Sequence, residues 1–477
     1  MIAAISVLCV IGLLEVYSTT SVTNISIDKP AYWSALMQGV FMVASVVICI
    51  LVAKIYPIFK LNATVIWMFW GLCVFLVLAV QPFGVERNGA KRWLELGSFT
   101  IQPSEFLKIA LMLVFVKILS EYQNGETDTR QMCIKTGFFI VLPLAFLFGF
   151  QRDLGTTLIC VVALLAVAYM SGISLVVLIG VVVVGVLGLS LLVFASDSFR
   201  SSRFLFLNPW NDGQNGQGDG FNIIRSYYAI AGGGIIGKGL GNSHEKYDYL
   251  FASDNDFIFA VICEELGLLG ALVVIACVVA IFISGLKLSS FCDSAETKLI
   301  VLGASTLITF QAFLNIGCAV GALPTTGKPF PFVSSGGSSI LASFLLVGLI
   351  FNCINFPVAE RAADRRRSKL QVIESSTKRT GTNFDKGKPR TVTNFENSAA
   401  TRHSSRVRRS SSSESVNTSS GKPRTVTSFD NRESRTVTNF DNPKTRTVTN
   451  FGNSRRKSRT GTDSGTKKRR GYIDYGD

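Results

Sequence analysis

Histidine is nearly absent from this chain, which has only His244 and His403 among its 477 residues. The 10 cysteines form no C-x-x-C pair and show no zinc-type spacing. These absences argue against a metal centre built from His and Cys and against catalysis by histidine. Any chemistry must therefore depend on carboxylates and basic side chains, and we interpret the cysteines as small packing residues.

Charge is scarce in the first three quarters of the chain, where apolar stretches follow one another up to residue 356. A stretch of about 20 apolar residues crosses a bilayer core. The sequence therefore predicts an all-α, polytopic membrane protein with about ten transmembrane helices. We expect them at 2–17, 35–56, 64–80, 105–119, 137–150, 155–170, 173–195, 256–283, 299–320 and 334–354, with a large loop, 196–255, between the seventh and the eighth.

Aliphatic residues are almost missing from the tail, 357–477, which we separate from the membrane domain, 1–356. The tail holds 28 Lys and Arg against 12 Asp and Glu, a balance of +16, whereas the rest of the chain holds 19 against 20. Five repeats of the type RTVTNF start at Arg379, Arg390, Arg424, Arg435 and Arg446. Their few apolar groups cannot offset chain entropy, so we predict disorder.

Two interpretations of the basic tail stay open. It either lies against anionic membrane lipids or docks partners such as division proteins, with threonines as kinase sites. A nucleic-acid role is weaker, because only single Phe residues are available for stacking.

Basic residues are also unequally divided between the short loops. Direct counting gives eleven on the side of both predicted termini and six on the other side. Cytoplasmic loops are usually the more basic, which places both termini in the cytoplasm and the loop 196–255 outside. Six external basic residues are still many, and we expect them to bind something anionic.

Two polar segments interrupt the apolar pattern between the third and fourth spans. The segment NGAKRWLELG, 88–97, carries Lys91 and Arg92 and reads as an amphipathic loop at the membrane surface. The segment IQPSEFLK, 101–108, reads as a helix start with Glu105 in its first turn and Lys108 one turn deeper. The loop would then place its cations over the end of this helix.

Charges inside or beside a span are costly and indicate function. Asp153 follows Arg152 in a tight turn, where the two side chains could simply pair. Asp254 and Asp256 precede the eighth span, and Glu264 and Glu265 follow about 12 Å further along the helix. Asp254 could be a helix cap and the two glutamates internal struts.

A loop rich in Pro and Gly, LPTTGKPFPFVSSGGSS at 323–339, opens the last span and contains Ser334. Exposed backbone N–H groups at such a helix start suit an anion. The glycines could equally serve close packing between helices.

These motifs together resemble those of the SEDS family (shape, elongation, division and sporulation), which includes FtsW, RodA and SpoVE. The resemblance runs over about 11–357 and rests on GAKRWLELG with IQPSEFLK, RDLGT, GKGLGNSHEKYDYL with DFIFAVICEELGLLG, and LPTTGKPFPFVSSGGSS. Within the family the chain looks most like the division protein FtsW, although the segment 329–333 is slightly more like RodA.

The chain departs from the family pattern at several motif positions. Asp254 and Asn255 stand where His and Thr are usual, and Arg152 stands where Pro is usual. Arg225 replaces a usual Gln and Ser335 a usual Tyr. The aspartate proposed to be catalytic in this family is kept here, as Asp256.

The resemblance implies a glycosyltransferase that polymerises lipid II into peptidoglycan at the outer face of the bacterial cytoplasmic membrane, beside a class B penicillin-binding protein that crosslinks the product. Asp256 is then the expected general base, with a pKa raised by its membrane boundary and by Asp254. We expect substrate contacts from Lys91, Arg92, Lys108, Arg225, Asp248, Asp153 and Ser334, and supporting roles for Glu105, Glu264, Glu265 and Asp254.

A divalent cation, Mg²⁺ or Mn²⁺, is a further expectation at the pyrophosphate, and no organic cofactor is expected. Asp248 would help hold this cation or the acceptor sugar, unless it is a plain surface acid.

Two other functions stay open. A flippase for lipid II fits ten helices with buried charges, but it needs a polar path across the whole membrane, whereas the charged motifs gather on one side. A scaffold that only recruits a transpeptidase needs neither Asp256 nor the cations.

Overall fold

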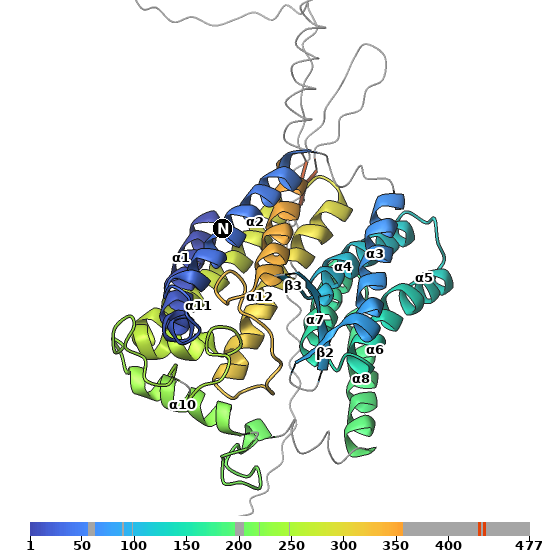
Figure 1. Cartoon of the computed structure of the whole chain (residues 1–477). Helices are drawn as coiled ribbons and strands as arrows, with labels where there is room; N and C mark the ends of the chain where they lie inside the picture. Colours follow the sequence, from blue (N-terminus) through green and yellow to red (C-terminus); the bar gives the residue numbers. More distant parts are fainter. Residues whose placement is uncertain are drawn as a thin grey trace, which may run out of the picture. The chain divides into compact units, whose positions relative to one another are not determined.

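The computed structural model describes residues 1–55, 63–87, 90–97, 99–195, 205–218, 220–247 and 249–355, and in the tail 428–430 and 433–435. Two compact units are present, Met1–Asp385 and Lys386–Asp477. The first is helical apart from one small sheet (Figure 1). Ahead of the sheet lie α1 (Ile2–Ser26), α2 (Trp33–Ile55) and α3 (Ala63–Phe83).

The remaining helices follow the sheet. They are α4 (Pro103–Gln123), α5 (Thr129–Thr136), the π-helix η2 (Gly137–Val141), α6 (Leu142–Gly149), α7 (Leu154–Met170), α8 (Leu175–Ala195), the short 3₁₀ helix η3 (Leu205–Leu207), α10 (Phe221–Gly233), α11 (Ile258–Ser289) and α12 (Ala295–Ala319). A last helix covers Gly337–Asn355.

Seven helical segments in the described part of the chain are long and apolar enough to cross a membrane. Two shorter apolar helices lie at α7 and α8, and α4 carries more charge. Each of the ten predicted spans falls on one of these helical segments. The prediction of a polytopic, helical membrane protein is therefore confirmed, while the count of ten spans stays a prediction.

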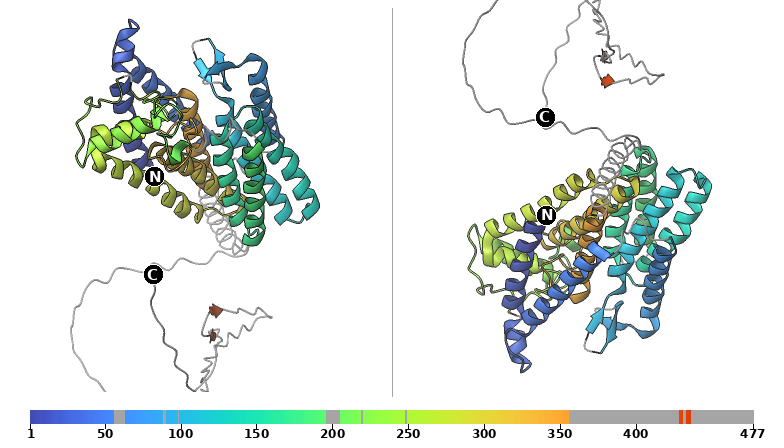
Figure 2. Two further views of the ribbon diagram at one scale, coloured as in Figure 1. Left: turned by 90° about the horizontal axis from the view of Figure 1, so that it is seen from below. Right: turned by 90° about the horizontal axis from the view of Figure 1, so that it is seen from above.

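The helix α12 forms the centre of the bundle. It packs against α11, α7 and α4, and 78% of its most apolar stretch is buried, compared with 22% for that of α2. Figures 1 and 2 show α1, α2 and α11 on one side and α3 to α8 on the other. Helices far apart in sequence thus meet at α12, and this arrangement brings the polar motifs together.

The segment predicted as an amphipathic loop forms an antiparallel sheet instead. Strands β1 (Val85–Arg87), β2 (Ala90–Leu96) and β3 (Phe99–Ile101) pair in the order β1-β2-β3, with Glu86 opposite Lys91 and Glu95 opposite Thr100. The alternation of polar and apolar residues in AKRWLEL suits a strand with one face on the bundle. Pairing also satisfies backbone groups that a loop would leave to solvent.

The helix α11 begins at Ile258, two residues later than predicted, and is bent at Gly267. This glycine has φ of 68°, a left-handed conformation that favours glycine. A Cβ there would collide with the backbone at Gly237. The bend therefore depends on close contact with the segment after α10, and it lies just beyond Glu264 and Glu265, which stay in the helical turns that begin at Ile258.

The tail contains two described strands, β4 (Ser428–Asp430) and β5 (Glu433–Arg435), which pair antiparallel within the second unit. Strand β4 closes the repeat that starts at Arg424, and β5 ends on Arg435, the first residue of the next repeat. The rest of 357–477 lies outside the described residues, so the predicted disorder and the boundary at 356 stay predictions.

Candidate active site

Asp256 lies in the turn that leads into α11, and three consecutive backbone carbonyls hold this turn in place. The carbonyl of Asp254 accepts from the Ser335 backbone N at 2.9 Å. That of Asn255 accepts from Ser334 Oγ at 2.6 Å, and that of Asp256 from Asn315 Nδ2 at 2.9 Å. Two distant segments, the loop before the last helix and α12, thus fix the aspartate.

The surroundings of Asp256 combine burial with charges of both signs. Burial and the neighbouring Asp254 raise its pKa, Lys328 and Arg92 oppose this increase, and the result is a pKa of about 6. Burial also raises the pKa of Asp254. A carboxylate that titrates near 6 is mostly ionised at neutral pH and is a stronger base than an ordinary aspartate.

Lys328 is the buried cation next to Asp256, and it pairs with Asp153. Its Nζ lies 2.8 Å from Asp153 Oδ2, and both side chains are fully buried. Asp153 also caps α7 by accepting from the Thr156 N–H at 3.1 Å. A Cβ on Gly155 would lie 2.5 Å from Lys328 Cγ, so this glycine makes room for the lysine.

These contacts explain the electrostatics of Asp153. Burial alone would raise the pKa of Asp153, but Lys328, Arg92 and the N–H of Thr156 lower it to about 2. The Asp153 side chain has no exposed surface, so it does not offer the direct contact with substrate that we predicted for it. Its partner is Lys328 rather than Arg152.

Arg92 reaches the site from β2. Its Nε donates to the carbonyl of Gln151 at 3.2 Å and its Nη2 to that of Arg152 at 2.7 Å. A Cβ on Gly327 would lie 3.7 Å from Arg92 Nη1 and 3.6 Å from Asp256 Oδ2, so the guanidinium and the carboxylate approach the same glycine. The sheet therefore brings Arg92 to Asp256 as predicted, with the half-exposed Lys91 beside it.

Lys108 and Glu105 lie in the core, and Lys108 has no open path to a substrate. The Lys108 amine is 2.6 Å from Glu105 Oε2 and 2.5 Å from Gln311 Oε1, and the lysine is 2% exposed. The buried Lys108 amine, with one contact to Glu105 and one to Gln311, thus links α4 to α12. The supporting role predicted for Glu105 fits this geometry, whereas the substrate contact predicted for Lys108 does not enter our proposal.

Glu264 and Glu265 hold neighbouring segments together through hydrogen bonds inside the protein, which is the structural alternative considered above. Glu264 accepts from Lys238 Nζ at 2.6 Å and from Ser243 Oγ at 2.5 Å. Glu265 accepts from Lys246 Nζ at 2.8 Å and from Ser18 Oγ at 2.6 Å. Together they fasten the segment 238–246 to α11 and to α1.

Arg225 of α10 belongs to a separate cluster. Its guanidinium lies 4.9 Å from the Phe221 ring and 4.8 Å from the Tyr249 ring, and 3.6 Å from Glu245 Oε2. Arg225 thus has ring and carboxylate partners within its own cluster, and its predicted substrate contact stays a prediction. Asp248 lies outside the described residues, so its predicted role stays untested.

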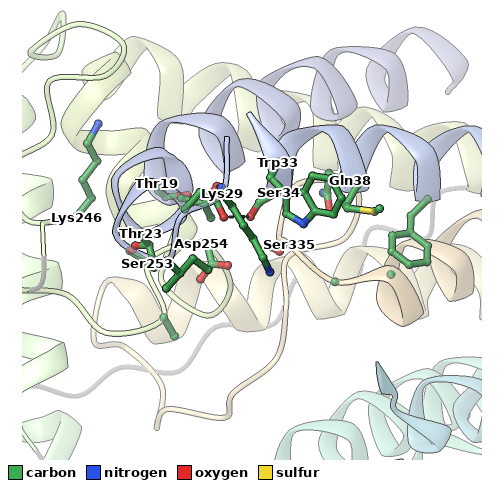
Figure 3. Close-up of a pocket in the computed structure, with 18 of the residues that line it drawn as sticks. Thr19, Thr23, Lys29, Trp33, Ser34, Gln38, Lys246, Ser253, Asp254 and Ser335 are labelled. Carbon is green, nitrogen blue, oxygen red and sulfur yellow. Dashed lines mark hydrogen bonds between the residues drawn. The ribbon is translucent and has the colours of Figure 1, made fainter. Parts of the chain in front are cut away.

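A polar pocket of about 610 Å³ opens beside Asp254, between the end of α1 and the start of α2. Figure 3 shows Asp254, Ser335 and Lys29 around the same space. An apolar groove of about 710 Å³ lies on the other face of α2, lined by Leu13, Tyr32, Ala35, Leu36, Gly39, Val40, Val43 and Ala44. A polar pocket and an apolar groove thus flank the same helix without sharing a lining residue.

No group of three or more His, Cys, Asp or Glu side chains that could hold a metal ion occurs in the described part of the chain. The charged groups nearest Asp256 are Lys328, Asp254 and Arg92. A divalent ion needs several oxygen ligands, and the positive charges of Lys328 and Arg92 would repel one held by protein side chains beside Asp256. The divalent cation stays a prediction, and no step below depends on it.

Three residues of the site were missed at the level of sequence. Asn315 and Gln311 of α12 and Lys328 of the following loop are each 1% exposed. Gln311 Nε2 donates to the Pro329 carbonyl at 2.9 Å, and Asn315 Nδ2 to the Lys328 carbonyl at 2.8 Å. Amides inside a predicted span were the available signal, because polar groups in a membrane segment need partners.

Known proteins with similar sequences are cell-wall proteins. The model of the FtsW, RodA and SpoVE family, described as a cell cycle protein, matches residues 1–357. A probable peptidoglycan glycosyltransferase FtsW from Synechocystis is 37% identical over 284 residues, 60% of this chain and 70% of that protein. Stage V sporulation protein E from Bacillus subtilis is 32% identical over 353 residues, 72% of this chain and 93% of that protein.

Solved structures share the fold. A chain from a study of how a peptidoglycan synthase complex coordinates polymerisation and crosslinking aligns with a TM-score of 0.57 at 22% identity, covering 74% of this chain and 96% of that one. RodA from Thermus thermophilus aligns with a TM-score of 0.53 at 22% identity, covering 74% and 95%.

Proposed function

Since this chain belongs to the FtsW, RodA and SpoVE family of multi-pass membrane proteins, we propose that it is a peptidoglycan glycosyltransferase that polymerises lipid II, with Asp256 as the general base. Relatives that carry the FtsW name support the division branch. The observation that carries the proposal is the geometry of Asp256: a carboxylate with a pKa of about 6, fixed by three backbone hydrogen bonds and facing Arg92.

The reaction joins the 4-hydroxyl of one disaccharide to C1 of another. Asp256 takes the proton of the hydroxyl, the oxygen bonds to C1, and the bond from C1 to the lipid pyrophosphate breaks. Arg92 and Lys91 supply positive charge for the leaving pyrophosphate. Arg92 suits this role because the carbonyls of Gln151 and Arg152 hold its guanidinium before substrate arrives.

The polar pocket and the apolar groove supply space for a lipid-linked sugar. Lys29 and Asp254 line the pocket, and Tyr32 begins the groove three residues beyond Lys29. We place a headgroup of lipid II in the pocket, and the groove on the other face of α2 is the proposed surface for a polyprenyl chain. The Lys29 ammonium attracts the pyrophosphate, and the groove buries hydrocarbon.

The setting of the reaction is also part of the proposal. We infer that the Asp256 end of the bundle faces the outside of the cytoplasmic membrane and that both termini are cytoplasmic, on the excess of basic loop residues. A class B penicillin-binding protein is the proposed partner, and the tail repeats are proposed to engage division proteins or membrane lipids. A divalent cation on the pyrophosphate would show as a loss of rate in EDTA that added Mg²⁺ restores.

The test is polymerisation of lipid II by the purified protein with its transpeptidase partner, for wild type, Asp256→Asn and the control Asp128→Asn, an exposed aspartate before α5. We expect long glycan strands from the wild type and from Asp128→Asn, and none from Asp256→Asn. Strands from Asp256→Asn at the wild-type rate would refute the base assignment. If no form makes strands although all fold, flipping of lipid II in vesicles becomes the function to test.

A further inference from the structure

A small cavity of about 30 Å³ lies directly beside Asp256, lined by Asp256, Phe257, Asn315, Cys318, Thr325, Thr326, Gly327 and Lys328. Two buried oxygens belong to residues of its wall, Asp256 Oδ1 and Asn315 Oδ1, and neither has a hydrogen-bond partner among the described residues. Both atoms accept hydrogen bonds and, for an ionised aspartate, neither can donate to the other. The wall thus offers two acceptors to whatever enters the cavity.

The Asn315 side chain cannot simply turn round to satisfy these atoms. Its Nδ2 already donates to the carbonyl of Asp256 at 2.9 Å and to that of Lys328 at 2.8 Å. A flipped amide would place an oxygen against both carbonyls and lose both bonds. The orientation of Asn315 is therefore set by the backbone of the two segments that it joins.

A space of this size admits one water molecule or one hydroxyl group, and a water needs at least two polar partners. A water, with two O–H groups, can donate to both unpaired oxygens, whereas a sugar hydroxyl can donate to one of them. Either donor bonded to Asp256 would favour its ionised form. The required chemistry is thus hydroxylic, and its source is either a resident water or the hydroxyl of the acceptor sugar.

We propose that Asn315 is a positioning residue for Asp256, whose amide nitrogen fixes the aspartate backbone and whose amide oxygen completes, with Asp256 Oδ1, a seat for one hydroxylic donor. The inference rests on the proposed function only where it concerns catalysis, because the seat itself is a property of the free protein. If a resident water fills the seat, Asn315 acts on the reaction only through Asp256; if the acceptor hydroxyl fills it, the amide oxygen also lies against that hydroxyl.

The charged groups facing Asp256 are Lys328 from the loop after α12, Asp254 from its own segment and Arg92 from β2. Cys318 of α12 is the titratable thiol on the cavity wall. None of them is changed by Asn315→Leu, which also adds no charge, so a change in the titration of Asp256 in that variant would report the lost seat.

The test compares Asn315→Asp and Asn315→Leu with wild type. Asn315→Asp keeps the size and an acceptor but loses the amide donor and adds a like charge, whereas Asn315→Leu removes donor and acceptor. Gln311→Leu is the matched control, because Gln311 lies one turn earlier on α12 and holds the same loop through the Pro329 carbonyl at 2.9 Å.

Polymerisation rates between about pH 5 and pH 8 give separate profiles for kcat and for kcat/KM, the first reporting the substrate complex and the second the free enzyme. We expect both Asn315 variants to lose roughly 10-fold or more in kcat. The acid limb, which is the fall in rate at low pH, should move upward by about one pH unit in Asn315→Leu, since the ionised Asp256 loses a hydrogen bond. In Asn315→Asp the added charge should move it further in the same direction. Gln311→Leu should leave the midpoint of the limb unchanged.

The outcomes separate the sources and the failure modes. A limb that moves in both profiles identifies a resident water, and a limb that moves in kcat alone identifies the acceptor hydroxyl. Unmoved limbs in folded variants, or the same shift in Gln311→Leu, overturn the inference while leaving the polymerase intact. If the wild type makes no glycan, the pH dependence of the unfolding temperature still decides, because loss of the seat would shift the Asp256 titration in the free protein.

Discussion

Replacing Asp256 by Asn should abolish polymerisation and stabilise the fold. Burial raises the pKa of Asp256 from 3.8 to about 6. Each unit corresponds to about 1.4 kcal/mol, so ionised Asp256 costs at most about 3 kcal/mol at neutral pH. Its side chain is partly exposed, which lowers the expected gain to about 1–3 kcal/mol.

The sign of the effect follows from proton linkage. Because the folded pKa is higher than the unfolded one, the folded protein binds more protons between about pH 4 and pH 6, and stability falls as pH rises through this window. Below it the aspartate is neutral in both states and the cost disappears. Asp256→Asn removes a group that is unfavourable only above the window, and its amide also supplies a donor near Asn315 Oδ1.

The assay is the unfolding temperature of detergent-purified protein as a function of pH, for wild type and Asp256→Asn. We expect the variant to melt higher at neutral pH and the two curves to meet near pH 4. The exposed Glu126→Gln serves as the control substitution and should not reproduce this pattern. A difference that is the same at every pH would refute the claim that burial of the ionised carboxylate causes it.

Three other substitutions test the supporting structure. Lys328→Met should destabilise the fold by about 3–5 kcal/mol, because it leaves Asp153 buried and unpaired, and adding Asp153→Asn should restore much of the loss in a melting experiment. The acid limb of polymerisation should also move upward in Lys328→Met, since this lysine opposes the rise in the pKa of Asp256. Glu265→Gln removes the partner of the buried Lys246, and limited proteolysis should then cut the segment 238–246 faster than in wild type. Gly267→Ala should lower the yield of folded protein severely, because its φ of 68° and its contact with the segment after α10 leave no room for a methyl group; normal yield would contradict the bent α11.

Much of the fold followed from hydropathy, because a bilayer requires long apolar helices and each predicted span falls on a helical segment. The sheet at 85–101 did not follow. Its strands are short, and AKRWLEL alternates in a way that suits either a strand or an amphipathic loop. Pairing with neighbours within a few residues decided between them, and such pairing has no strong signal in a single sequence.

For the site, the sequence located the motifs but did not give the partners of their charges. Lys91 and Arg92 were expected near the catalytic end, and Arg92 is there. Lys108 and Arg225 were expected to bind substrate as well, yet Lys108 is enclosed by Glu105 and Gln311. Whether a basic side chain binds a ligand or holds two helices together depends on which acidic side chain packs against it. That acidic side chain can come from any distant helix.

Asn315 illustrates the opposite error. A single amide in an apolar span carries no charge and belongs to no charged motif, so it attracted no attention in the sequence. Its importance comes from two carbonyls, at Asp256 and Lys328, that lie 59 and 13 residues away and cannot be recognised from side-chain type. Backbone partners of this kind become visible only in three dimensions.

One departure from the family motif, Asp254, acts directly on the electrostatics of Asp256. Asp254, in place of a usual His, adds a negative charge that raises the pKa of Asp256, whereas Lys328 and Arg92 lower it. Lys328 is itself paired with Asp153, and Arg92 donates to the carbonyls of Gln151 and Arg152, so both cations have partners other than Asp256. Burial and Asp254 raise the pKa of Asp256, the two cations lower it, and the result is a pKa of about 6. With this pKa the carboxylate is ionised at neutral pH and is still basic enough to take a proton from a sugar hydroxyl.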